Sequence, residues 1–86
     1  MMEIEQARTN WDDWKKYLGH MVEFAEELGM SPDRIKNMAA QAGDLLAQHV
    51  PPANPEQRVL KELWDVADEQ EQQTLAGLMT KLAKRS

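Results

Sequence analysis

The 86-residue sequence contains no cysteine and no long apolar segment. The lack of cysteine excludes a disulfide framework, a thiolate nucleophile and any zinc site that depends on cysteine ligands. No apolar run approaches the roughly 20 residues that a membrane-spanning helix needs, and no signal-peptide pattern is present. The sequence therefore predicts neither a membrane partner nor export, and we expect a cytoplasmic location.

Positive charge is also scarce, with 10 Lys and Arg residues against 15 Asp and Glu residues and a formal net charge of −5. No stretch is basic enough to supply the phosphate contacts on which nucleic-acid binding depends, so no nucleic-acid partner is expected. The 4 glycines are isolated from one another and form no phosphate-binding loop. The sequence therefore predicts neither nucleic-acid binding nor phosphate binding by a glycine-rich loop.

Strand patterns are missing too, because valine and isoleucine do not alternate with polar residues over a useful length. Helical periodicity instead covers the chain almost from end to end. The sequence predicts an all-α protein, a compact four-helix domain over residues 11–86 that follows a flexible N-terminal arm over residues 1–10. The expected helices span residues 11–28, 32–50, 55–67 and 69–84.

Each predicted helix begins with a residue whose side-chain oxygen can accept a hydrogen bond from the first turn. These N-cap residues are Asn10, Ser31, Asn54 and Asp68. Gly29 is placed to close the first helix in a left-handed conformation. The boundary between the last two helices is the weakest, because residues 68–74 contain neither glycine nor proline. One continuous helix from Pro55 to Lys84, exchanged between subunits, is therefore an alternative to two separate helices.

Each helix carries an apolar stripe, and the predicted core is drawn from these stripes. The residues expected to be largely buried are Leu18, Met21, Ala42, Leu46, Leu63, Trp64, Leu78 and Leu82. Six methionines and three tryptophans give this core a large apolar area and adaptable packing. Gly43 and Gly77 lie inside helices, where glycine costs about 1 kcal/mol relative to alanine, so each predicts a close approach of another helix.

The segment TNWDDWKKYLGH places two carboxylates between two tryptophans, but we do not expect an acid–base site there. Asp12 and Asp13 are neighbours in a helix and point about 100° apart, and a role at the helix start explains both. His20, Glu23 and Glu27 could offer metal ligands along one helix face. A metal centre in a bundle draws its ligands from several helices, however, and the other helices do not supply them. No catalytic residue, metal ligand, cofactor or small-molecule substrate is therefore predicted, and we expect the protein not to be an enzyme.

Two charge clusters are the candidate partner-binding residues. They are Glu23, Glu26 and Glu27 in the first helix, and Lys81, Lys84 and Arg85 in the last. The acidic cluster opposes the dipole of its own helix end, whereas the basic cluster suits its helix end. The two clusters are expected to pair, either within one chain or across the two-fold axis of a homodimer. A solvated acidic face that aids solubility is the alternative.

Four motifs between Trp11 and Leu82 resemble a known protein family. They are W-D-x-W-K-x-Y-L-G, G-M-S, N-P-E-x-x-x-L-K-E-L-W-x-V-A-D and E-Q-x-x-L-A-x-L-M-x-K-L. The pattern is similar to that of small, uncharacterised, all-helical cytosolic proteins of endospore-forming bacteria, catalogued as a domain of unknown function. The resemblance implies an all-α cytosolic protein and carries no catalytic or ligand residue with it.

Two functions fit these observations. The first is a non-enzymatic protein-interaction module that self-associates, because the chain is acidic, rich in Met and Trp, and without site chemistry. The second is a small acidic regulator that docks on a basic protein partner such as a DNA-binding protein. Salt separates the two, since pairing between exposed charges is screened at high ionic strength.

Overall fold

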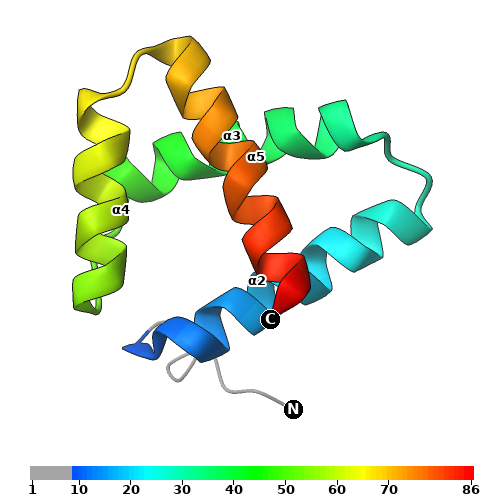
Figure 1. The fold of residues 1–86 in the computed structure, drawn as a ribbon, viewed down its shortest axis with the longest axis horizontal. Helices are drawn as coiled ribbons and strands as arrows, with labels where there is room; N and C mark the ends of the chain where they lie inside the picture. The colour runs from blue at the N-terminus through cyan, green and yellow to red at the C-terminus, as the bar shows by residue number, and fades with distance from the viewer. Residues whose placement is uncertain (1–8) are drawn as a thin grey trace.

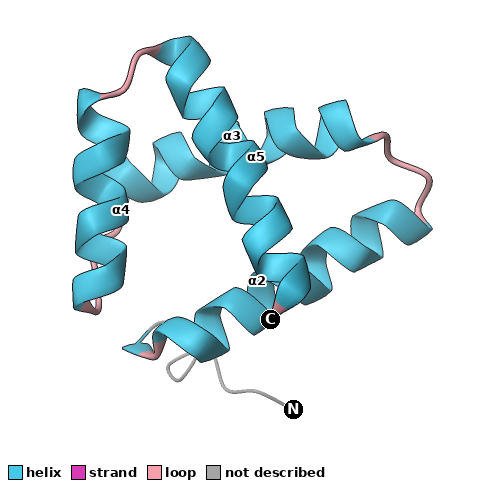
Figure 2. Cartoon of the chain, viewed as in Figure 1, coloured by secondary structure: helices cyan, strands magenta, loops and turns pink. Residues whose placement is uncertain are grey.

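The computed structural model describes residues 9–86, which form four α-helices (Figure 1). The helices are α2 (Trp11–Glu27), α3 (Pro32–His49), α4 (Pro55–Val66) and α5 (Glu69–Arg85). All start where they were predicted, each ends within one residue of the predicted end, and no strand occurs in the described part of the chain (Figure 2). The all-α, four-helix prediction is confirmed. Most of the predicted arm, residues 1–8, lies outside the described residues.

The helices form an open frame rather than a bundle of parallel rods (Figure 1). Helices α2 and α3 diverge from their connecting turn, α4 runs between their far ends, and α5 crosses in front of both (Figure 1). The most extensive contacts between helices are those of α5 with α2 and with α3. The C-terminal helix therefore holds the frame together.

Local signals at the helix ends behave as the sequence predicts. Every predicted N-cap accepts a hydrogen bond from the backbone N–H three residues on: Asn10, Ser31, Asn54 and Asp68. Gly29 closes α2 with φ +86°, the left-handed conformation that glycine adopts without strain. The Asp68 carboxylate accepts from the Glu71 backbone at 2.8 Å, and the Glu71 carboxylate accepts from the Asp68 backbone at 3.0 Å. This reciprocal capping box separates α4 from α5, so the continuous-helix alternative is wrong.

The buried core differs from the predicted one. Of the residues expected to be largely buried, Trp64 is buried and Leu18 is half-buried. The others are exposed: Met21, Ala42, Leu46, Leu63, Leu78 and Leu82. The buried residues within 9–86 are mostly small, namely Gly19, Ile35, Trp64, Ala76 and Ala83. The prediction of the core was therefore wrong for most of its members.

The physical reason lies where α2 crosses α5. A Cβ atom on Gly19 would collide with the backbone carbonyl of Ala83, so the two helix backbones are in direct contact there. Small residues permit this approach, and it turns a small-residue face of α5 toward its neighbours. Leu78 and Leu82 lie about 100° or more around α5 from Ala83, by the geometry of an α-helix. They consequently stay outside the contact.

Candidate interaction surface

An apolar groove of about 350 Å³ runs between all four helices. Ile35, Trp64 and Ala76 line it and are buried. Met21 of α2 and Leu46 of α3 also line it, yet they are 55% and 40% exposed. The groove therefore opens to solvent between α2 and α3.

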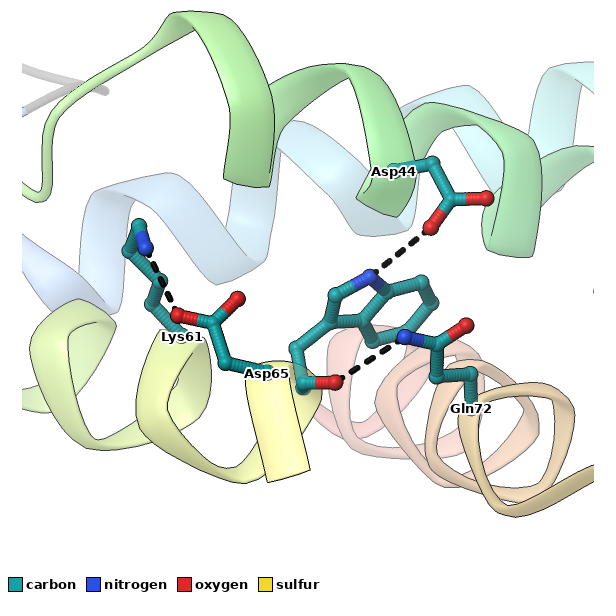
Figure 3. Close-up of polar contacts among 5 residues, drawn as sticks. Asp44, Lys61, Asp65 and Gln72 are labelled. Carbon is teal, nitrogen blue, oxygen red and sulfur yellow. Dashed lines mark hydrogen bonds and ion pairs between the residues drawn. The ribbon is translucent and has the colours of Figure 1, made fainter. Parts of the chain in front are cut away.

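Trp64 lines the groove and attaches α4 to the other helices by hydrogen bonds to two residues labelled in Figure 3, Asp44 and Gln72. Its indole Nε1 donates a hydrogen bond to Asp44 Oδ1 of α3 at 3.0 Å, and its backbone carbonyl accepts one from Gln72 Nε2 of α5 at 2.9 Å. The ring packs on Gly43 so closely that a Cβ atom there would lie 2.7 Å from the ring carbon Cη2. The close approach predicted at Gly43 is confirmed, with an indole ring in the place of a helix backbone. Gly77 meets only the side chain of Lys36.

Three large residues of α2 and the C-cap residue Leu28 form an exposed apolar stripe, which we call the α2 seam. They are Tyr17, Met21, Phe24 and Leu28, with exposed fractions of 42%, 55%, 62% and 67%. Their spacing of four, three and four residues is the spacing of a coiled-coil seam. They lie about 140–200° around the helix from Gly19, on the side away from α5. The helix therefore buries its glycine face and exposes its largest apolar residues.

Further apolar residues are exposed on the other helices. On α3 they are Met38, Leu45 and Leu46. On α4 and α5 they are Val59, Leu63, Val66, Leu78 and Leu82. Large exposed apolar patches on a small protein mark sites of interaction, so the surfaces that carry these residues are the candidates. Met21 of the α2 seam and Met38 and Leu46 of α3 line the groove, whereas the named α4 and α5 residues do not.

The predicted charge clusters meet at one point within the chain. Lys84 Nζ lies 2.8 Å from Glu26 Oε2, across the crossing of α2 and α5. The remaining members of the clusters are exposed and form no ion pair within residues 9–86: Glu23, Glu27, Lys81 and Arg85. A role for these four residues in binding a partner stays a prediction.

The residues weighed as catalytic or metal-binding lie at the helix start and on the surface. Asp12 pairs with Lys15 one turn on at 3.5 Å, and the Asp13 backbone donates to the N-cap. His20 is exposed. In the part of the chain that the structure describes, no group of three or more His, Asp or Glu side chains is arranged to hold a metal ion.

The fold and the surface define a class: small all-α proteins whose single chain leaves an apolar groove open. The chain belongs to the DUF3243 family of proteins of unknown function, whose profile matches residues 6–84. The resemblance inferred from the sequence motifs is thereby confirmed. None of the helices within residues 9–86 is long and apolar enough to span a membrane.

Two relatives come from the endospore-forming bacterium Bacillus subtilis (strain 168). The chain is 40% identical over 77 residues to the uncharacterized protein YmfJ, an alignment that covers 90% of this chain and 91% of YmfJ. It is 38% identical over 81 residues to the uncharacterized protein YflH, covering 94% of this chain and 78% of YflH. No solved structure gives a significant match.

Proposed function

We propose that the protein is a non-enzymatic protein-interaction module of the cytoplasm that associates with a second copy of itself. The observation that supports this most directly is the open groove, lined in part by large apolar side chains that are 40–55% exposed. A chain that buries mainly glycine and alanine leaves much of its apolar area in water. Association removes that area from water at a gain of about 25 cal/mol per Å².

Because the domain is small, association with a partner would add substantially to its stability. A domain of 86 residues buries a smaller fraction of its unfolded surface than a larger domain does, and its stability is correspondingly modest. A partner that binds only the folded chain adds to that stability by mass action. A second copy meets this need, because it carries the same exposed apolar surface.

The apolar surface favours self-association over the alternative, an acidic regulator of a basic protein. One member of the acidic cluster, Glu26, is already paired with Lys84 of its own chain. The exposed acids that remain would each contribute only about 0–1 kcal/mol to a complex. The apolar residues offer a larger and less salt-dependent gain.

We expect the purified protein to sediment at twice its chain mass of 9.9 kDa at micromolar concentration and to dissociate on dilution. Because apolar burial drives the association, raising the salt concentration to about 0.5 M should leave the dimer intact, whereas charge pairing would be screened. Sedimentation equilibrium over a concentration series measures both effects. A single species of one-chain mass up to high micromolar concentration would contradict the proposal.

A further inference from the structure

We propose that two copies pair through their α2 seams, antiparallel to each other, about a two-fold axis between Met21 and Phe24. The second copy then covers the open side of the groove. This inference rests on the proposed self-association and specifies its surface and orientation. The partner is a second copy of this chain.

The seam has the form that a helix presents to another helix. Tyr17, Met21, Phe24 and Leu28 follow the alternating spacing that places one side chain per turn toward a facing helix. The crossing with α5 uses the opposite side of α2, at Gly19, so the described chain leaves the seam residues 42–67% exposed. An identical seam on a second copy is self-complementary about a two-fold axis.

Charge on one flank of the seam selects the antiparallel orientation. Lys16 and His20 precede Glu23 and Glu27 on this flank, about 40–100° around the helix from Gly19. All four are exposed, and none forms an ion pair within the part of the chain that is described. Antiparallel pairing sets Lys16 of one copy near Glu27 of the other, and His20 near Glu23. Parallel pairing would instead set this flank against the opposite, apolar flank of the other copy, which carries Leu18, Val22 and Ala25, and would leave the four polar side chains without partners.

The position of Glu26 supports a division of the acidic cluster into one residue that binds within the chain and two that bind the other copy. It lies on the side of α2 that faces α5, where it pairs with Lys84. The glutamates next to it face the seam flank and are left for a partner. Glutamates at the C-terminal end of α2 interact unfavourably with the dipole of that helix. Lys84 of α5 offsets this effect within the chain, and Lys16 and His20 of the other copy offset it across the dimer.

The available area suits a stable dimer. An aromatic side chain buries about 150–250 Å² when it is fully covered, and Leu and Met bury somewhat less. Covering all of the exposed surface of the seam and the neighbouring α3 residues would therefore bury on the order of 800 Å² per subunit. A specific protein–protein interface of standard size buries about 800 Å² per partner. The α3 residues concerned are Met38, Leu45 and Leu46, which are 52%, 62% and 40% exposed.

Cysteine pairs test the orientation directly, because the chain contains no cysteine of its own. In the antiparallel dimer, Tyr17 of one copy faces Leu28 of the other, within the Cα separation of about 7 Å that a disulfide needs. The two Leu28 residues are then roughly 16 Å apart along the helices. Tyr17→Cys mixed with Leu28→Cys should give a disulfide-linked dimer on oxidation, whereas either variant alone should not.

Controls in this experiment separate the other arrangements. Leu28→Cys that links to itself would indicate parallel seams and overturn the inference. Leu63→Cys, on the exposed face of α4, should stay unlinked; if it links while the mixed pair does not, the dimer uses the α4–α5 face instead. A protein that sediments as a monomer overturns the proposed function as well. A dimer without seam crosslinks overturns the inference alone.

Charge reversal tests the flank independently. Glu23→Lys with Glu27→Lys should raise the dissociation constant by about five- to twentyfold, since each exposed pair contributes up to about 1 kcal/mol and the axis repeats it. Adding Lys16→Glu and His20→Glu should restore most of the affinity. Reversing Lys81 and Arg85 in the same background is the matched control and should restore nothing. Recovery by that control in place of the first would show that the α5 end is the true partner of these acids.

Discussion

Replacing Trp64 with alanine is expected to lower the free energy of unfolding by about 3–5 kcal/mol, the usual cost of removing a buried tryptophan. Trp64 is the largest buried residue in the part of the chain that the structure describes, at 7% exposure. Its ring fills the space beside Gly43, and its indole N–H satisfies Asp44. The substitution leaves a cavity at the groove and removes the one buried residue that attaches α4.

Urea unfolding followed by circular dichroism at one fixed protein concentration measures this loss, since the stability of a dimer depends on concentration. Trp11→Ala is the matched control. Trp11 is only half-buried at the start of α2, where the centroid of its ring lies 5.2 Å from the centroid of the Trp14 ring. Its loss should be clearly smaller. Equal losses at the two positions would show that Trp64 does not anchor α4.

Gly19→Ala is expected to destabilise the protein by about 1–3 kcal/mol, the usual cost of forcing atoms into a packed site. A loss of stability would be informative, because helix propensity alone favours alanine over glycine by about 1 kcal/mol and predicts a gain. At Gly19 the added methyl group would meet the backbone carbonyl of Ala83, which cannot move without separating α2 from α5. The clash outweighs the gain in helix propensity.

Gly77→Ala is the comparison that isolates the crossing. A Cβ atom at Gly77 would lie 3.1 Å from Cδ of Lys36, whose flexible side chain can move aside. Helix propensity then dominates, and this variant should gain up to about 1 kcal/mol. Thermal unfolding of both variants at one protein concentration measures whether each substitution lowers or raises the stability of the protein. A gain at Gly19 would contradict the tight crossing.

The helices could be predicted from the sequence because their signals are local. An N-cap such as Asn54 and the capping box of Asp68 and Glu71 need only residues within one turn, and all of them form as predicted. The close approach at Gly43 was also predictable, because a glycine inside a helix among alanines has a cost that packing must offset.

The core could not be predicted in the same way, because burial depends on which part of a wide stripe another helix covers. Met21 and Leu78 satisfy the periodicity of a buried face, yet each is 55% exposed in the single chain. The crossing at Gly19 was missed, although an isolated glycine in the middle of α2 and the small residue Ala83 were visible signals. Pairing two small residues across distant helices requires the topology, which periodicity does not contain.

The candidate site was predictable only in part. The sequence placed unbalanced acids at the end of α2 and bases at the end of α5, and the structure joins one pair of them, Glu26 and Lys84. The exposed seam of α2 was missed, because the apolar periodicity assigned Met21 to the core and did not single out Tyr17 and Phe24. Which side of α2 stays exposed depends on where α5 crosses.

The crossing of α2 and α5 also bears on the order in which the chain folds. Glu26 and Lys84, which bond across it, are 58 positions apart, whereas Trp64 and Asp44 are 20 apart and Trp64 and Gln72 are 8 apart. Contacts between distant residues carry a larger loop-closure entropy and form more slowly. Docking of α2 should therefore follow the assembly of α3, α4 and α5 as a separate, slower event. Stopped-flow refolding of a variant that keeps Trp64 as its sole tryptophan would report the earlier event. A variant that keeps Trp14 beside Trp64 should show an additional, slower phase that times the docking of α2.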